Sequence, residues 1–152
     1  FGFQAHAEWK GIDLTLFFQG TAKRDLWTND SRFFGIGNEW DVPMKKSLDY
    51  WTADNTGAYL PRPYINGSHG NWEVSTRYLQ NAAYIRLKQL SLGYTIPSMW
   101  IKKAGINNAR IYFTGQNLLT MTKLSKLYDP ENFSIMNYPV PKSYSIGLNL
   151  TF

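Results

Sequence analysis

A long polar stretch near residues 21–80 holds the side chains best suited to binding a ligand. The candidates for substrate contact are four tryptophans, two acidic or amide residues and one arginine: Trp27, Trp40, Trp51, Trp72, Asp54, Asn55 and Arg62. Indole rings stack on sugar rings, and carboxylate, amide and guanidinium groups hydrogen-bond to hydroxyls. The same residue types are also enriched at protein interfaces. The sequence therefore leaves three roles open: ligand contact, contact with a partner protein, or internal packing of the loop.

No arrangement of residues typical of catalysis occurs in the sequence. It contains no nucleophile elbow, phosphate-binding loop, HExxH or EF-hand motif. Cysteine is absent, and the two histidines, His6 and His69, lie far apart in the chain, so we expect neither a metal site nor a cofactor. Asp129 and Glu131 form a carboxylate pair, but Pro130 between them favours a turn. We therefore expect that the chain is not an enzyme.

The composition narrows the class of protein further. Aromatic residues make up 16% of the chain, which is typical of membrane-interface girdles or of sugar-binding surfaces. The net charge of +5 comes from scattered basic residues, which argues against nucleic acid as a partner. No apolar run reaches the roughly 18 residues of a membrane helix, whereas strands that cross a membrane in a barrel remain possible.

The last ten residues alternate strictly between apolar and small polar side chains. The apolar members are Tyr144, Ile146, Leu148, Leu150 and Phe152, and serine, glycine, asparagine and threonine lie between them. This period of two predicts a strand. Its length matches the roughly 9 to 11 residues that a tilted strand needs to cross a bilayer. We expect the apolar side chains to face lipid and the small polar ones to face a wet interior.

The same alternation predicts four further strands. With the last one, they lie near 1–9, 12–20, 84–96, 109–119 and 143–152, and Phe17 is an exception to the pattern of the second. The connections are short at Lys10–Gly11 and 97–108, and long at 21–80 and 121–141. Barrels of the outer membrane have short periplasmic turns and long extracellular loops, so this sorting predicts which end of the sheet lies outside the cell.

The short connection at 97–108 is expected to hold one periplasmic helix. Ser98 can cap its start, and Gly105 suits the left-handed conformation that ends a helix. Lys102 and Lys103 suit its C-terminal dipole.

Five strands are too few to close a barrel, for which about eight is the smallest single-chain case. An open sheet in lipid would leave N–H and C=O groups unpaired at both edges, at a cost of several kcal/mol for each group. The missing neighbours must come from residues upstream, from a second chain or from copies of this one. We therefore expect the chain to be too short to be the whole protein.

Several motifs, taken together and in this order, resemble those of the SusC/RagA family of TonB-linked outer-membrane proteins. They are KGIDL at 10–14, WTADN at 51–55, YLPR at 59–62, YIRLKQLSLGYTIP at 84–97, ARIYFTGQNLL at 109–119, YDPE at 128–131 and YPVPKSYSIGLNLTF at 138–152. The resemblance covers nearly the whole chain. It identifies the chain as the C-terminal part of a TonB-dependent receptor, residues 1–152 supplying the last five strands of an all-β, antiparallel transmembrane barrel.

The resemblance also implies the fold, the transport activity and the partners of the whole receptor. The parent barrel would have about 22 strands with a plug inside. It would import oligosaccharides or peptides across the outer membrane of a Gram-negative, Bacteroidetes-like bacterium. Its partners would be a SusD-like surface lipoprotein, outer-membrane lipid, and TonB, which would act through the part of the receptor missing from this chain. The final strand, with Phe152 as its terminal aromatic residue, resembles the signal read by the barrel-assembly machinery.

Two other classes of protein are alternatives to a transporter. A secreted, soluble β-sandwich that binds carbohydrate would also explain the tryptophan-rich loop. A glycan-cleaving enzyme would need two carboxylates positioned on either side of a bond, and nothing in the sequence places such a pair.

Overall fold

The computed structural model describes residues 1–28, 30–65, 70–134, 137–138 and 140–152. His69, considered above as a metal ligand, lies outside the described residues. The chain divides into two compact units. We call the first, of Phe1–Arg24 and Asn81–Phe152, the sheet unit, and the second, of Asp25–Gln80, the loop unit.

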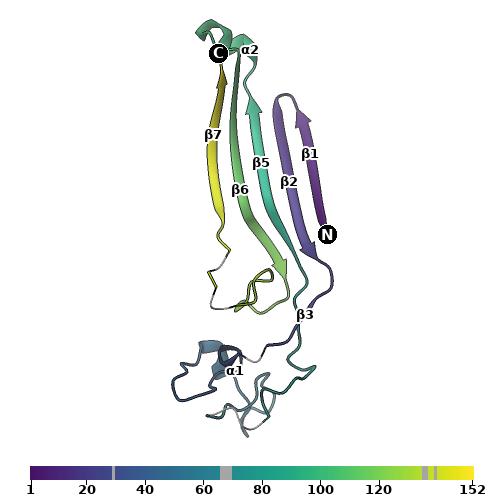
Figure 1. Cartoon of the computed structure of the whole chain (residues 1–152), viewed down its shortest axis with the longest axis vertical. Helices are drawn as coiled ribbons and strands as arrows, with labels where there is room; N and C mark the ends of the chain where they lie inside the picture. The colour runs from purple at the N-terminus through teal and green to yellow at the C-terminus, as the bar shows by residue number, and fades with distance from the viewer. Residues whose placement is uncertain (29, 66–69, 135–136, 139) are drawn as a thin grey trace. The chain divides into compact units, whose positions relative to one another are not determined.

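The sheet unit contains a five-stranded antiparallel sheet (Figure 1). Its strands are β1 (Gly2–Trp9), β2 (Ile12–Thr21), β5 (Tyr84–Thr95), β6 (Asn108–Thr122) and β7 (Ser143–Thr151). They lie side by side in the order β1-β2-β5-β6-β7, so each pairs with the strands of this sheet that come before and after it in the chain. All five predicted strands are present, and β6 runs further than the predicted end near 119.

The register brings the apolar sides of all five strands onto one face. Trp9 lies opposite Ile12, which lies opposite Tyr94 on β5. Tyr94 in turn lies opposite Ile111, and Ile111 opposite Leu148 on β7. Directly opposed residues of antiparallel strands point to the same side of the sheet. The row is therefore continuous from one edge of the sheet to the other, and all five of its side chains are exposed.

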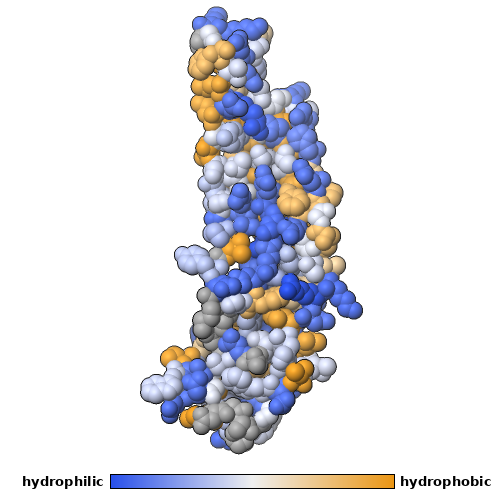
Figure 2. Space-filling view, viewed as in Figure 1, coloured by the Kyte–Doolittle hydropathy of each residue, from blue (hydrophilic) through white to orange (hydrophobic). Residues whose placement is uncertain are grey.

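The opposite face of the sheet carries the polar side chains. Figure 2 shows one face of the molecule, on which hydrophilic residues gather along the middle of the sheet. Phe17, which breaks the alternation of β2, lies on the polar side, because it is paired with Gln4 and Gln89. The pairing of β2 with β5 shifts register directly after Phe17: Phe18 lies opposite Leu87, so Lys88 is an extra residue on β5 and Leu87 lies with Phe18 on the apolar face.

Two glycines let large side chains cross the polar face. Arg110 on β6 donates to both carboxylate oxygens of Asp13 on β2, with Nε–Oδ1 at 2.9 Å and Nη2–Oδ2 at 2.5 Å. A Cβ on Gly93 of β5, between them, would collide with both side chains. Tyr112 likewise covers Gly147 of β7, and the Arg110 guanidinium lies 5.2 Å from the Tyr112 ring centroid. This polar row ties β2 to β7 across the strands between them.

The short connections lie at the same end of the sheet (Figure 1). Lys10 and Gly11 make the β1–β2 turn with φ values of 47° and 84°. The 97–108 connection holds α2 (Ser98–Ile101) and η2 (Lys102–Ala104), and Gly105 ends it at φ 75°, as predicted. The predicted cap at Ser98 is wrong: the helix begins at Ser98 itself, so Pro97 takes the capping position and no side chain caps the helix.

The loop unit contains little regular structure and packs around aromatic rings. Its elements are β3 (Asp25–Leu26), α1 (Ser31–Phe34), η1 (Lys45–Leu48) and the first residue of β4 (Gln80–Asn81), and β3 pairs with β4. Phe34 is fully buried, and its ring meets Phe33 at a centroid distance of 5.0 Å and Tyr78 at 5.1 Å. Among the described residues, no helix is long and apolar enough to span a membrane.

Replacing Gly93 by alanine tests the crossing of the polar face. The added Cβ would displace the Arg110–Asp13 pair, so we expect the free energy of unfolding to fall by about 1 to 3 kcal/mol. The measurement is the urea midpoint of the folded protein. Gly57→Ala is the control, because its Cβ would meet nothing within 4 Å. Equal midpoints for the two variants would show that the Arg110–Asp13 pair can form over Gly93 without needing a glycine there.

Candidate functional site

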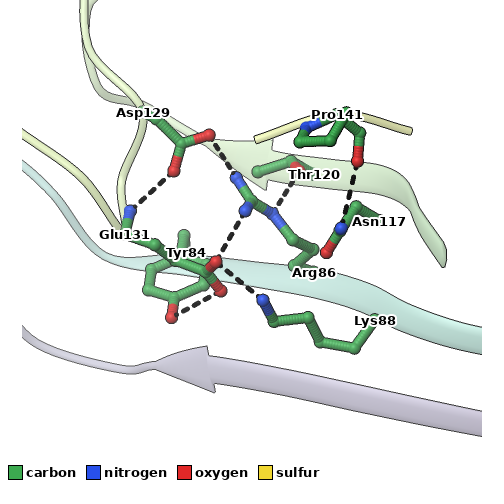
Figure 3. Close-up of polar contacts among 8 residues, drawn as sticks. All are labelled: Tyr84, Arg86, Lys88, Asn117, Thr120, Asp129, Glu131 and Pro141. Carbon is green, nitrogen blue, oxygen red and sulfur yellow. Dashed lines mark hydrogen bonds and ion pairs between the residues drawn. The ribbon is translucent and has the colours of Figure 1, made fainter. Parts of the chain in front are cut away.

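A charge cluster joins the wall of the sheet to the loop after β6. Arg86 on β5, only 3% exposed, donates Nη2 to Asp129 at 2.6 Å and Nη1 to Glu131 at 2.7 Å. Its Nε donates to Thr120 of β6 at 2.8 Å, and Lys88 donates to the same Glu131 oxygen at 2.7 Å. Figure 3 shows Arg86 at the centre of these groups. Two cations thus face two carboxylates, and the buried guanidinium has a partner on each of its nitrogens.

The same loop is fixed again near its far end. Asn117 has a left-handed backbone, with φ 54°, and donates Nδ2 to the Pro141 carbonyl at 3.1 Å (Figure 3). Tyr84 adds a further bond to the first anchor, from its hydroxyl to Glu131 at 3.1 Å. The loop between β6 and β7 is therefore attached to the polar side chains of the sheet unit at two points.

The sequence identified only part of this cluster. The turn expected at Asp129 and Glu131 is present, because the Glu131 N–H donates to Asp129 Oδ1 at 2.8 Å. The ion pairs with Arg86 were missed. A signal was available: Arg86 and Lys88 are the two charged residues of a strand whose other side chains are uncharged.

The loop unit holds a cavity of about 510 Å³. Three of its lining residues, Ala58, Leu60 and Tyr78, are buried. The other lining residues are Trp51, Thr56, Pro61, Arg62, Tyr64, Asn71 and Arg77. Trp51 and Tyr64 are both exposed enough to contact a ligand in this cavity. Of the seven residues proposed above for substrate contact, the cavity brings together Trp51 and Arg62.

The other five predicted residues lie outside this lining. Trp72 stacks on Phe34 at a centroid distance of 6.1 Å, and Trp27 lies 6.2 Å from the same ring, as expected for internal packing of the loop. Asn55 donates to Asp49 at 3.0 Å within a turn. Asp54, beside it, is exposed, and Trp40 is 85% exposed.

Arg77, which the sequence did not single out, is held firmly at the edge of the cavity. It donates Nη2 to the Ala58 carbonyl at 2.9 Å and Nε to the Tyr59 carbonyl at 3.3 Å. The Tyr59 hydroxyl donates back to the Arg77 carbonyl at 3.1 Å. Partial burial raises the pKa of Tyr59, which keeps that hydroxyl protonated and able to donate.

No group of three or more histidine, aspartate or glutamate side chains placed to hold a metal ion occurs within the described ranges. The described residues do offer an anchored loop, and a cavity lined by aromatic side chains and two arginines.

Substituting Arg86 by glutamine tests the loop anchor. Two partly buried carboxylates would lose their main partner, so we expect a loss of about 2 to 3 kcal/mol in stability and faster hydrogen exchange in residues 123–134. Hydrogen exchange followed by mass spectrometry is the measurement. Lys126→Gln, an exposed residue of the same loop, is the charge-matched control. An exchange pattern shared by both variants would contradict the anchor.

No family model matches the chain. Two relatives match nearly all of it, and both come from Formosa agariphila. TonB-dependent receptor P3 is 30% identical over 99% of this chain and 16% of its own length. TonB-dependent receptor P26 is 28% identical over 100% of this chain and 17% of its own length. The chain thus spans less than a fifth of the length of either relative.

Solved structures agree with this match in both sequence and fold. The structure of the RagAB peptide transporter superposes with a TM-score of 0.74 at 34% identity, covering 99% of this chain and 17% of that one. The RagAB peptide importer in its "open-open" state gives 0.73 at 32%, with the same coverage. The resemblance stated from the motifs is confirmed: the chain belongs to the SusC/RagA family of TonB-dependent receptors.

Proposed function

We propose that this chain supplies part of the barrel wall and of the extracellular loops of an outer-membrane, TonB-dependent importer. The observation that carries the proposal is the unbroken apolar row from Trp9 to Leu148. Among the described elements of the sheet unit, each strand contacts its lateral neighbours, β6 also contacts α2, and no second sheet covers that row. Lipid would bury these side chains, and the polar face would then line the interior.

The unpaired edges of the sheet favour the proposal that this segment belongs to a larger, closed barrel. Within the described residues, β1 and β7 each pair with one strand only. Their outer N–H and C=O groups need partners in a bilayer, where water cannot hydrogen-bond to them. Neighbouring strands of the same receptor would satisfy both edges, since the relatives are several times longer than this chain. A barrel of about 22 strands around a plug accommodates this segment.

The orientation follows from the two kinds of connection. The Lys10–Gly11 turn and α2 would lie at the periplasmic end, and the long connections at 21–80 and 121–141 outside the cell. There the loops would meet a SusD-like surface lipoprotein. TonB would act through parts of the receptor outside this chain.

The proposal extends to the cargo of the receptor. The similar RagAB structures are those of a peptide transporter and a peptide importer, which favours peptides over oligosaccharides as the cargo. Trp51 and Arg62 are the loop residues best placed to touch cargo.

The assembly machinery would read five apolar side chains in and directly after β7, all of which are exposed: Tyr144, Ile146, Leu148, Leu150 and Phe152.

A soluble carbohydrate-binding sandwich is the alternative, and the sheet argues against it. A sandwich buries the inner faces of two packed sheets about 10 Å apart. The described part of the sheet unit has a single sheet, and large apolar side chains such as Ile146 and Phe3 stay exposed on it.

Labelling of single cysteines in whole cells tests location and orientation together. We expect a membrane-impermeant maleimide to label Ala53→Cys in intact cells, and Met99→Cys only after the outer membrane is permeabilised. Both residues are exposed, so access to the reagent alone decides the result. Equal labelling of the two positions in intact cells, or recovery of the protein in the soluble fraction, would refute the proposed location.

A further inference from the structure

We infer that the cavity between Trp51 and Arg62 binds a carboxylate group of the cargo, which makes the receptor selective for acidic ligands. The inference rests on the proposed import function and adds to it the charge of the cargo. It starts from the juxtaposition of two arginines with the aromatic side chains of Trp51 and Tyr64 in the lining of one cavity.

Charge is segregated within the loop unit. Residues 25–80 contain seven acidic and five basic side chains, so the unit as a whole is slightly acidic. The lining of the cavity has the opposite charge: among the described residues it contains Arg62 and Arg77 and no acidic residue. Within the described residues, no carboxylate lies within ion-pair distance of either arginine. An anion entering this cavity would meet two positive charges and no fixed negative one.

The guanidinium groups of the two arginines are held in place to different degrees. The two backbone carbonyls that accept from Arg77 fix its guanidinium before any ligand arrives. Arg62 is exposed, and its only described ring contact is with Tyr64, at 5.7 Å. Its flat guanidinium can therefore turn to hold a carboxylate with two parallel hydrogen bonds. Arg77 would supply a fixed charge, and Arg62 the contact that decides affinity.

The rest of the cavity fits the body of a ligand that carries such a group. A volume of about 510 Å³ is within the range of small-molecule sites. Trp51 and Tyr64 offer ring faces to an apolar side chain or a sugar ring, and the side chains of Asn71 and Thr56 line the same wall. A peptide with a free C-terminus and an oligosaccharide of uronic acid both present a carboxylate beside such a body, so the shared chemistry is what the cavity recognises.

The test uses the intact receptor in detergent and two pairs of probes, with affinities measured by calorimetry. One pair is a tetrapeptide with a free C-terminus and the same peptide amidated; the other is an oligogalacturonate and its methyl ester. At least one charged probe should bind about tenfold more tightly than its neutral partner. Arg62→Gln should remove that preference, Arg62→Lys should restore part of it, and Lys45→Gln, an exposed residue outside the cavity, should change nothing.

The two pairs also identify the source of the carboxylate, because preference within one pair alone assigns the site to peptides or to acidic glycans. Equal binding of charged and neutral probes, no binding of either charged probe, or a preference that survives Arg62→Gln would overturn the inference. Such results would leave the import function standing, since the cell-labelling pattern tests that function separately.

Discussion

An antiparallel sheet whose apolar side chains all point one way must bury that side in something other than water. In this chain the apolar row runs across all five strands, and none of the described elements covers it. Hydrophobic burial contributes roughly 25 cal/mol per Å² of apolar area. Leaving a face of this size exposed to water would therefore cost free energy. The proposed contact of this face with lipid would remove that cost, and the roles proposed for the polar face, the turns and the loops follow from it.

The polar face carries charged groups that need partners. Arg110 reaches Asp13 over the gap that Gly93 leaves, and Arg86 takes its partners from the loop that follows the next strand. Charges paired in this way stiffen the wall and fix the loop at its rim. The loop unit has its own aromatic core, so its cavity does not need the sheet to form its floor.

The sequence predicted the strands well because a period of two reports directly which side chains share a face. It did not predict the contacts that depend on register. Arg110 and Asp13 are 97 residues apart, and Arg86 and Asp129 are 43 apart, so only the pairing of strands and the path of the loop bring them together. The tryptophans were ambiguous for another reason: Trp72 packs inside the loop unit while Trp51 lines the cavity, and the two are alike in sequence context.

The central claim is that one face of the sheet contacts lipid and the other contacts water. Fluorophores on single cysteines at Leu92 and Ser91, neighbours on the middle strand β5, test it most directly in receptor reconstituted into bilayers. The account predicts that a lipid-borne quencher dims the label at Leu92, and that a water-soluble quencher dims the one at Ser91. Quenching of both labels by the water-soluble agent, with neither sensitive to the lipid-borne one, would contradict it.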